Sequence, residues 1–555
     1  MDETQSAATE QATIADSAAP DPARGSHPES RATPGVIAPP AAHSLLRYAP
    51  ALMLLLVVVA DSVQYADTDT WGHVLFGRIM LNSGHLMRHE IFSYSAPDGP
   101  WIDHEWLSEI VMAIFYNAMG VVGLKLMKFL CAGATLLLLG AAVAESGAGT
   151  SLQMGVLLAV AFALQLQIQF RPQLFDYIFL SALLALFARA RSRGRAPLWI
   201  VVPMMALWAN LHGGFFIGIV VLGLYAGTAL LIDLWNGAGP ARGLRFLLLA
   251  LAASLITLVN PYGAGEWRIV AHTLRNPYTM SAGVEFQSFF HVVAGTWRSG
   301  LALFPFLVAL GVMAAFVVSF ALAPCADDLP EVAIAGLMVL LALYSVRNMA
   351  FAMLACAGPI AFHAHRALAR IAPAQSADAV TTPRRHPPPH ASPGVQLCAL
   401  IAALAICIGD GLFSPRLPDF TGYPVGAVAF MRQHRLQGRI LNEFLWGSYI
   451  LWHAPDSKVF IDGRFEMVYP PDVQRAYLDF IRGGAGAGAA LAAYPPDYVL
   501  VRPDSTAATF MGEQSDWRLI YRDPVAVLFA RADAPAAHMQ GVPIVRDFAP
   551  PSLFP

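Results

Sequence analysis

The chain has 555 residues, of which 56% are hydrophobic and only 13% are charged. Soluble domains are on average about 45–50% apolar and about 25% charged, so this chain has too few ionisable groups to cover the surface of a soluble protein. The net charge of −3, from 35 basic and 38 acidic residues, argues against nucleic acid as a partner. Composition therefore excludes a soluble single-core enzyme and predicts a polytopic membrane protein.

Eleven segments are apolar and close to the length of about 20 residues that a helix needs to cross a bilayer. They are 45–60, 124–144, 152–170, 173–188, 196–211, 214–232, 244–260, 301–323, 331–346, 348–365 and 395–413. A twelfth apolar segment, 107–122, is short and contains Glu109 and Asn117, so we interpret it as an interfacial or re-entrant helix. The predicted fold class is a polytopic α-helical membrane protein with about 11–13 spans.

The arginines indicate the orientation, because basic residues in short loops stay in the cytoplasm. With eleven spans and a cytoplasmic N-terminus, the Arg-rich loops near 189–195, 242–245 and 366–385 all lie on that side. The predicted order is a disordered cytoplasmic tail (1–44), a transmembrane module (45–366), a Pro-rich cytoplasmic linker (367–394), a last span (395–413) and an extracytoplasmic domain (414–555).

Residues 414–555 have the pattern of a small α/β domain. Helical patterns at 425–435 and 472–482 alternate with short apolar stretches that are typical of strands. Those stretches are 458–464, 497–502, 517–523 and 526–531. In VFIDGR, Asp462 and Arg464 flank a glycine, and we interpret them as an ion pair within this domain.

The outer loop 61–106 carries seven acidic residues against two arginines. Asp67 and Asp69 form an Asp-x-Asp pair that could hold Mg²⁺ or Mn²⁺ or supply a general base near the membrane surface. His73 follows on the same segment. The alternative is that these acidic residues only mark the water side of a span.

Asp103, His104 and Glu105 make a second candidate acid/base or metal cluster in the same loop. On a helix, three consecutive side chains point to different faces, so we expect that they do not all contact one ligand. The alternative is an interfacial segment with ordinary polar residues.

Arg171 and Arg347 lie at the outer ends of spans, and Arg347 has no compensating acid nearby in the sequence. Charges in such places are costly and point to function. A phosphate or diphosphate headgroup is the natural partner of the planar guanidinium fork. The alternative for each arginine is a side chain that reaches from a helix end to water.

Two further turns at the outer ends of spans contain glycine or proline, and these are WANLHGG (208–214) and NPYG (260–263). Asn210 and His212 of the first turn could contact the ligand. The alternative is a capping turn, although an imidazole between two apolar spans needs a hydrogen-bonding partner.

These motifs resemble the bacterial polytopic proteins related to the GT-C glycosyltransferases, such as the protein O-mannosyltransferases and the lipid A aminoarabinose transferases. The resemblance covers roughly residues 45–535 and rests on Asp-x-Asp-x-Trp-x-His at 67–73, PWIDHEWL, WANLHGG, NPYG, NEFLWGSY and VFIDGR. It implies a polyprenyl-phosphate-linked sugar donor and transfer on the outer face of a bacterial inner membrane. By position, it also implies that Asp67 or Asp69 is the catalytic base or a metal ligand. Mannosyltransferases tend to have Asp-Glu there, and Asp-Thr-Asp leaves open which carboxylate works.

Three functions remain open at this point. The first is an inverting glycosyltransferase in which Asp67 or Asp69 deprotonates a glycan, lipid or protein acceptor while Arg347, Arg171 or both hold the departing phosphate. The second is a transporter or flippase of a lipid or small solute, for which internal repeats would be expected. The third is a non-catalytic envelope scaffold that binds a partner through its outer domain.

Overall fold

The computed structural model describes residues 50–554. Within this range it does not describe residues 238, 277–283, 300–302, 372–392, 410, 412–413, 419–421, 484–485, 539–543 and 546–552. The predicted tail 1–44 and most of the predicted linker 367–394 lie outside the described residues. All of the described residues belong to one compact unit.

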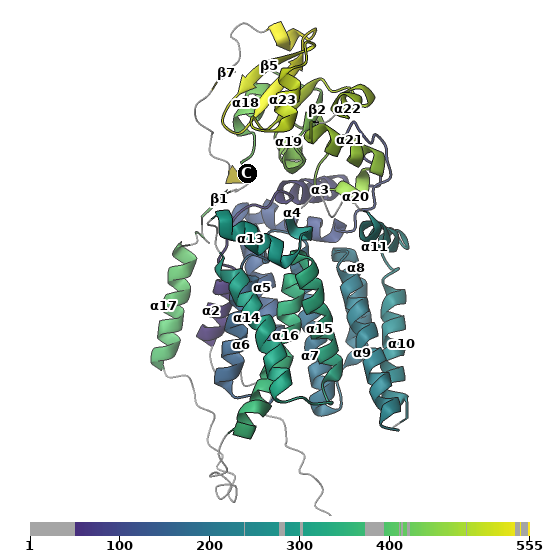
Figure 1. The fold of residues 1–555 in the computed structure, drawn as a ribbon, viewed down its shortest axis with the longest axis vertical. Coiled ribbons are helices and arrows are strands. Elements are labelled where there is room, and N and C mark those ends of the chain that lie inside the picture. The colour runs from purple at the N-terminus through teal and green to yellow at the C-terminus, as the bar shows by residue number, and fades with distance from the viewer. Residues whose placement is uncertain are drawn as a thin grey trace, which may run out of the picture. The chain divides into compact units, whose positions relative to one another are not determined.

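A bundle of helices makes up the larger part of this unit (Figure 1). Its helices are α2 (Pro50–Ala60), α5 (Val121–Ala144), α6 (Thr150–Leu164), α7 (Gln173–Arg193), α8 (Val201–Leu211), α9 (Phe215–Trp235), α10 (Ala241–Ile256), α14 (Phe304–Leu322), α15 (Leu329–Tyr344), α16 (Met349–Ile371) and α17 (Pro393–Gly409). Short 3₁₀ turns precede two of them, η1 (Leu198–Ile200) before α8 and η3 (Val346–Asn348) before α16. Each of the eleven predicted spans falls on one of these helices.

Four helices of the described part are long and apolar enough to cross a membrane, namely α5, α7, α9 and α14. Others, among them α6 and α15, are shorter apolar helices, and the predicted segment 152–170 ends in a turn that the hydropathy pattern does not reveal. The eleven candidate spans are thus placed correctly on helices of the bundle, and four of these helices meet the length and apolarity of a membrane span.

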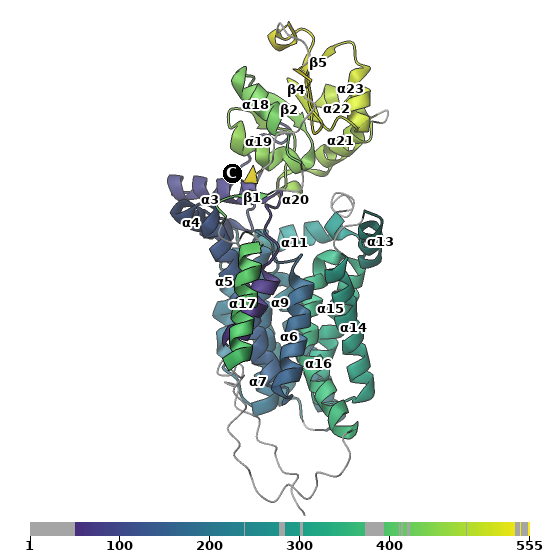
Figure 2. The same ribbon diagram turned by 90° about the vertical axis from the view of Figure 1, so that its left-hand side faces the viewer.

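Four further helices accompany the bundle at one end: α3 (Thr70–Ser83), α4 (Trp106–Met119), α11 (Gly265–Arg275) and α13 (Phe289–Ser299). Figures 1 and 2 show α3 and α4 lying across that end of the bundle. Helix α4 has 14 residues, fewer than a span needs, which agrees with the interfacial interpretation of 107–122. Helix α3 was not predicted, because its sequence carries no strong apolar stripe.

Residues 414–554 contain a six-stranded mixed sheet in the order β3-β2-β4-β6-β5-β7. The strands are β2 (Arg439–Asn442), β3 (Lys458–Val459), β4 (Tyr498–Val501), β5 (Trp517–Arg522), β6 (Val527–Arg531) and β7 (Ile544–Val545), and β1 (Leu417–Pro418) pairs with β8 (Leu553–Phe554) in a small second sheet. Strand β2 is parallel to β3 and β4, whereas β6 is antiparallel to β4 and β5. All four residues of β4 are buried, as expected for a central strand.

Helices of the C-terminal domain pack around this sheet. They are α18 (Val425–Gln433), α19 (Gly447–His453), α20 (Phe465–Val468), α21 (Pro471–Ile481), α22 (Ala487–Ala493) and α23 (Thr506–Gly512), with 3₁₀ turns η5 (Phe444–Trp446) and η6 (Pro535–His538). The four predicted strand segments and both predicted helices overlap observed elements, although only Lys458–Val459 of the segment 458–464 form a strand and β2 was not predicted. The sequence thus predicts a small α/β domain correctly.

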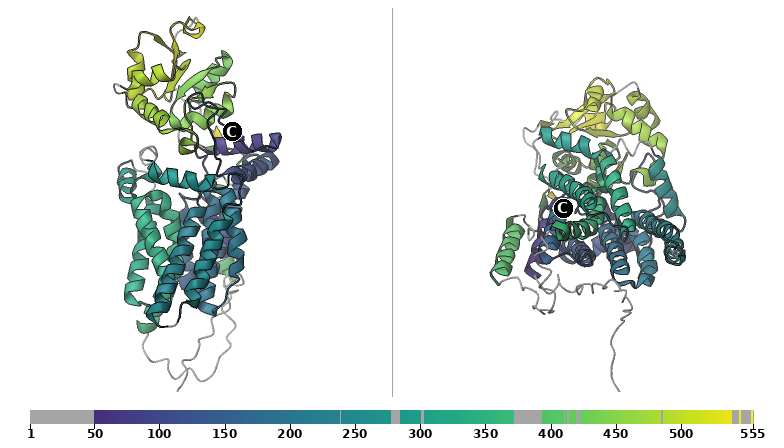
Figure 3. Two further views of the ribbon diagram at one scale, coloured as in Figure 1. Left: turned by 90° about the vertical axis from the view of Figure 1, so that its right-hand side faces the viewer. Right: turned by 60° about the horizontal axis from the view of Figure 1, so that its bottom comes forward.

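The C-terminal domain contacts the bundle through the outer loop, at the end where α3 and α4 lie (Figure 3). Trp71 of α3 is completely buried, and its ring lies 5.2 Å from that of Tyr449 and 5.6 Å from that of Trp452. The hydroxyl of Ser93 donates to the carbonyl of Phe460 at 3.1 Å. The outer loop and the C-terminal domain therefore share one core.

Candidate active site

A cavity of ≈ 610 Å³ lies where the end of the bundle, the outer loop and the C-terminal domain meet. Its lining includes Asp67, Asp69 and His73 from the start of the outer loop and α3, and Arg171 and Arg347 from the ends of bundle helices. The C-terminal domain adds Ser448, Gly463 and Arg464. Such a cavity is of the size that binds small molecules, which usually occupy about 300–1,000 Å³.

Arg171 is the centre of the charge network in this cavity. It precedes α7, where the Arg-Pro step ends the preceding turn. Its Nε lies 2.5 Å from Asp67 Oδ1, and its Nη2 lies 3.0 Å from Asp69 Oδ2. The guanidinium of Arg171 therefore forms ion pairs with both carboxylates of the Asp-x-Asp pair. This positive charge lies between the two carboxylates, where a metal cation would otherwise bind.

Glu285 of η2 (Val284–Phe286) connects the two predicted phosphate-binding arginines. Its Oε2 lies 2.9 Å from Arg171 Nη1, and its Oε1 lies 2.9 Å from Arg347 Nη1. Arg347 has no compensating acid nearby in the sequence, but the fold supplies one from a turn about 60 residues away. Burial raises the pKa of Glu285, but the two arginines outweigh burial and lower it below its usual value.

Asp69 lies at the N-terminal end of α3, against the C-terminal domain. A side-chain carbon at Gly463 would lie only 2.0 Å from Asp69 Oδ1, so the glycine of the VFIDGR motif makes room for this carboxylate. Burial raises the pKa of Asp69 to about 7, although Arg171 lowers it. A carboxyl group with this pKa exchanges protons near neutral pH.

Arg464, next to Gly463, connects the C-terminal domain with the outer loop at the cavity. Its Nη2 lies 2.5 Å from Asp462 Oδ2, which confirms the predicted ion pair, and its Nη1 pairs with Glu90 of the outer loop. The guanidinium also lies over the ring of Trp101, 4.5 Å from its centre. This buried network fastens the C-terminal domain to the outer loop.

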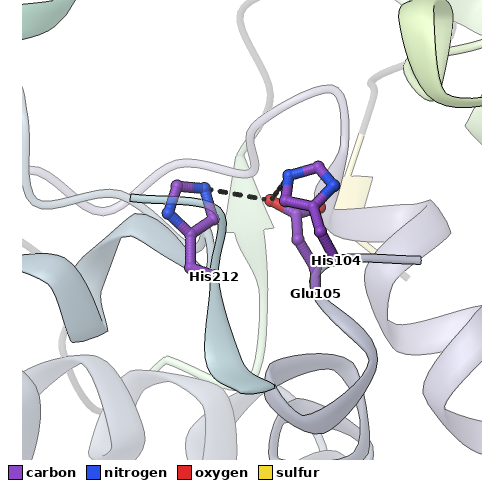
Figure 4. Close-up of side chains that lie close together, drawn as sticks. All are labelled: His104, Glu105 and His212. Atoms are coloured by element: carbon purple, nitrogen blue, oxygen red, sulfur yellow. Dashed lines mark ion pairs between the residues drawn. The ribbon is translucent and has the colours of Figure 1, made fainter. Parts of the chain in front are cut away.

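Glu105 lies among three imidazoles at the N-terminal end of α4. Its Oε1 is 3.2 Å from His212 Nε2 and 3.8 Å from His104 Nε2, and its Oε2 is 3.7 Å from His73 Nδ1. Figure 4 shows Glu105 between His104 and His212. Burial raises the pKa of Glu105, but the histidines outweigh it and lower the pKa far below its usual value. Glu105 is therefore ionised at neutral pH.

His212 is held from its other side by Asp176, whose Oδ2 lies 2.6 Å from His212 Nδ1. The indole N–H of Trp208 donates to Asp176 Oδ1 at 2.7 Å. Burial lowers the pKa of His212, but Asp176 and Glu105 raise it to about 9. The prediction that this imidazole needs a buried partner is confirmed, and it has two.

The close packing of His104 and Asp176 explains the two glycines of the WANLHGG motif. A side-chain carbon at Gly213 would lie 2.8 Å from the His104 ring, and one at Gly214 would lie 2.2 Å from Asp176 Oδ2. Both positions are closed to larger residues because other side chains of the network occupy the space.

Asp103 and Glu109 are both 2% exposed and lie next to Glu105. Burial raises the pKa of Asp103 to about 7, and Glu105 adds to the effect. Burial together with Asp103 also raises the pKa of Glu109 well above its usual value. Glu109 Oε1 lies 3.0 Å from His73 Nδ1, so the protonated carboxyl can donate to the neutral imidazole.

The structure brings most predicted site residues together in this cavity. Its lining contains Asp67, Asp69, His73, Asp103, His104, Glu105, Arg171 and Arg347. Asp103, His104 and Glu105 all line it, because they precede the first residue of α4, Trp106, and the argument from helix faces does not apply to them. His212 reaches the site through Glu105, whereas the amide of Asn210 donates to the carbonyls of Ala206 and Val259 outside the lining.

Sequence reasoning missed two members of the site. Glu285 follows a polar stretch between spans, and Asp176 is the single acid in the first turn of an apolar helix. An isolated buried acid in an apolar helix is itself a signal of a charged partner, and it could have revealed Asp176.

Two groups of side chains in the described residues could hold a metal ion, His104–Glu105–His212 and His73–Glu105–Glu109. Within each group the ligating atoms lie within 4.8 Å of one another. The first, with two imidazoles and one carboxylate, fits a transition metal such as Zn²⁺ or Mn²⁺ better than Mg²⁺, which prefers oxygen ligands.

No protein-family model matches the chain, and no curated protein matches its sequence. Among solved structures, the archaeal oligosaccharyltransferase AglB from Archaeoglobus fulgidus, in complex with an inhibitory peptide and a dolichol-phosphate, is similar with a TM-score of 0.52. The match covers 81% of this chain and 69% of AglB at 11% identity. The chain has a GT-C-like fold.

Two further GT-C structures give lower scores. ArnT from Cupriavidus metallidurans bound to undecaprenyl phosphate has a TM-score of 0.47 over 90% of this chain and 100% of ArnT, at 14% identity. The mycobacterial arabinofuranosyltransferase AftD has a TM-score of 0.45 over 86% of this chain and 41% of AftD, at 14% identity. The GT-C-like fold and the four long apolar helices make this a polytopic membrane protein.

Proposed function

We propose that this protein is an integral-membrane glycosyltransferase that moves a sugar from a polyprenyl-phosphate-linked donor to an extracytoplasmic glycan, lipid or protein acceptor. It lies in a bacterial inner membrane with the cavity and the C-terminal domain outside the cytoplasm. The observation that carries the proposal is a carboxyl group with a pKa near 7, Asp69, in the same ≈ 610 Å³ cavity as two arginines at the end of the bundle.

Arg171 and Arg347 are the binding site of the donor phosphate in this proposal. Glu285 joins them, with both of its oxygens 2.9 Å from a guanidinium nitrogen. Two oxygens of a phosphodiester can accept from a guanidinium in the same bidentate way as a carboxylate, and the polyprenyl phosphate that departs carries more charge than Glu285. The donor therefore takes the place of Glu285, which neutralises the arginines until the phosphate arrives.

Asp69 is the general base. The acceptor hydroxyl oxygen forms a bond to the anomeric carbon of the sugar while the bond from that carbon to the phosphate oxygen breaks. The hydroxyl proton passes to Asp69, and the electron pair of the broken bond stays on the polyprenyl phosphate. A single displacement of this kind inverts the anomeric centre. A pKa of about 7 matches a base that works near neutral pH.

Asp67 positions Arg171 rather than accepting the proton. Its Oδ1 accepts the backbone N–H of Asp69 at 3.1 Å and lies 2.5 Å from Arg171 Nε. This carboxylate thereby links the base to the phosphate-binding side chain. A loss of Asp67 should weaken donor binding as well as the rate.

A divalent cation, where one is bound, would be held by His104, Glu105 and His212. It would stabilise negative charge that develops on the leaving phosphate. Without it, Glu105 and His212 orient each other through their 3.2 Å ion pair. His73 lies on the same side of the cavity, with its Nδ1 3.0 Å from Glu109 Oε1.

The experiment compares lipids and products for the wild type, Asp69→Asn and Asp67→Asn in bacterial membranes. We expect a polyprenyl-phosphate-linked sugar to co-purify with the wild type and with Asp69→Asn, identified by mass spectrometry, and glycan modification to be lost in Asp69→Asn. Asp67→Asn should retain less lipid. Recovery of bulk phospholipid alone, or full modification by Asp69→Asn, would contradict the proposal.

A further inference from the structure

A second pocket, of ≈ 510 Å³, lies in the C-terminal domain outside the active-site cavity. It is formed where α18 and α19 both end, and the two pockets share no residue. Its lining includes Arg432, Arg435, Gln437, Trp452, His453 and Asp456. We call it the Arg435 pocket.

The charge of the Arg435 pocket comes from its two arginines. Among the described residues, neither Arg432 nor Arg435 pairs with a carboxylate. The only acid of the lining is Asp456, whose Oδ2 accepts a hydrogen bond from Gln437 Nε2 at 3.0 Å. Burial and the charge of Arg432 lower the pKa of His453 to about 4, so this imidazole is neutral at pH 7. With two arginines against one aspartate, the lining of the pocket has a net positive charge.

Arg435 adopts a backbone conformation that disfavours arginine. Its φ is 54°, and the N–H of Leu436 donates to the carbonyl of Met431 at 2.8 Å, which closes the C-terminal end of α18. Glycine is the usual residue at this place in a helix end. The chain follows that rule at Gly84 and Gly194, where φ is 69° and 65°.

Among the described residues, Asp98 is the other non-glycine residue with a positive φ, and aspartate tolerates this conformation. Arginine does not share that tolerance, and non-glycine residues in the left-handed region are concentrated at functional sites. The strain at position 435 therefore points to a use of its guanidinium, which distinguishes this arginine from an ordinary exposed one.

The Arg435 pocket is close to the active-site cavity and to α3. Ser448 of α19 lines the cavity, and His453 at the other end of α19 lines the Arg435 pocket. Five residues of helix separate them by about 7.5 Å along the axis. Trp452 of the pocket lies under the guanidinium of Arg78 of α3, 5.5 Å from the ring centre.

We propose that the Arg435 pocket is a phosphate-binding site, in which the guanidinium groups of Arg432 and Arg435 hold a phosphate group beside Trp452. Two guanidinium forks match phosphate oxygens in charge and geometry. The phosphate belongs either to a lipid headgroup at the membrane surface beside α3 or to a soluble phosphorylated molecule. This site does not depend on the proposed transfer reaction.

The test measures binding by the full-length protein, so that its result does not depend on transfer activity. One arm titrates inorganic phosphate against the protein in detergent. The other compares nanodiscs of phosphatidylcholine with nanodiscs that also contain phosphatidylglycerol, by native mass spectrometry. The variants are Arg432→Gln and Arg435→Gly, and the matched control is Arg518→Gln, an exposed arginine of β5 outside both pockets.

In at least one arm, we expect the wild type and Arg518→Gln to bind phosphate or phosphatidylglycerol with the same affinity. The affinity of Arg432→Gln and Arg435→Gly should be at least about tenfold lower. Binding of inorganic phosphate identifies a soluble ligand, whereas selective retention of phosphatidylglycerol alone identifies a headgroup. Because glycine relieves the backbone strain, Arg435→Gly should have an unchanged or higher Tm. Equal binding by all four proteins, or no binding by the wild type in both arms, would overturn the proposal.

Discussion

Replacing Glu285 by glutamine tests whether Glu285 competes with the donor phosphate for the two arginines of the active-site cavity. Glu285 makes two ion pairs, each 2.9 Å long, with Arg171 and Arg347. A phosphate that takes the place of Glu285 must first break both pairs. Glutamine keeps the shape of the side chain and removes its charge, so the variant should bind the donor phosphate more tightly.

The size of the effect follows from the exposure of the three side chains, which is 17% for Arg171 and 35% for both Arg347 and Glu285. Partly exposed ion pairs contribute about 0.5–1 kcal/mol each, so the two pairs together oppose phosphate binding by about 1–2 kcal/mol. This converts to an affinity about 5- to 30-fold higher in Glu285→Gln.

The assay is a titration of the purified full-length protein with undecaprenyl phosphate. Glu513→Gln is the matched control, because Glu513 is exposed and lies outside the cavity lining. It should bind like the wild type. An affinity of Glu285→Gln equal to or lower than that of the wild type would refute the idea that Glu285 occupies the place of the phosphate.

Three further predictions follow from the site and its supports. Because the pKa of Asp69 is about 7 and its ionised form is the base, the transfer rate should rise between about pH 6 and about pH 8, and a pH-independent rate would contradict this role. Gly214→Ala should destabilise the protein by about 1–3 kcal/mol in thermal inactivation, because its new carbon would lie 2.2 Å from a carboxylate; Gly227→Ala, with nothing within 4 Å, should be neutral. Arg464→Gln leaves two buried carboxylates without their partner and should cost about 3–5 kcal/mol, seen as faster proteolysis between the bundle and the C-terminal domain. Arg531→Gln, which removes only an exposed pair, should leave the stability unchanged and be cleaved like the wild type.

The helices of the bundle could be located from the sequence because an apolar segment is a local property. Whether a helix is long enough to span depends on where it ends, and the helix at the predicted segment 152–170, α6, has 15 residues. Helix α3 escaped prediction for a different reason. Its Trp71 is buried by Tyr449 and Trp452, which lie several hundred residues later in the chain.

The candidate site was predictable where several chemical groups are close together in the sequence. Asp67, Asp69 and His73 are within seven residues, and all three line the cavity. Asp176 and Glu285 were not predictable in the same way, because each stands alone in its segment and gains its role from a partner that the fold supplies.

The sequence by itself determined that this is a membrane protein, where the helices of its bundle lie and which residue types its outer face carries. These properties depend on composition and on order along the chain. The tertiary structure alone decided which charges meet: Glu285 between two arginines, Arg171 against the Asp-x-Asp pair, and Glu105 among three imidazoles. Ion pairs and pKa shifts depend on separations of a few ångströms in a buried environment, and residues at such separations come from segments that are far apart in the chain.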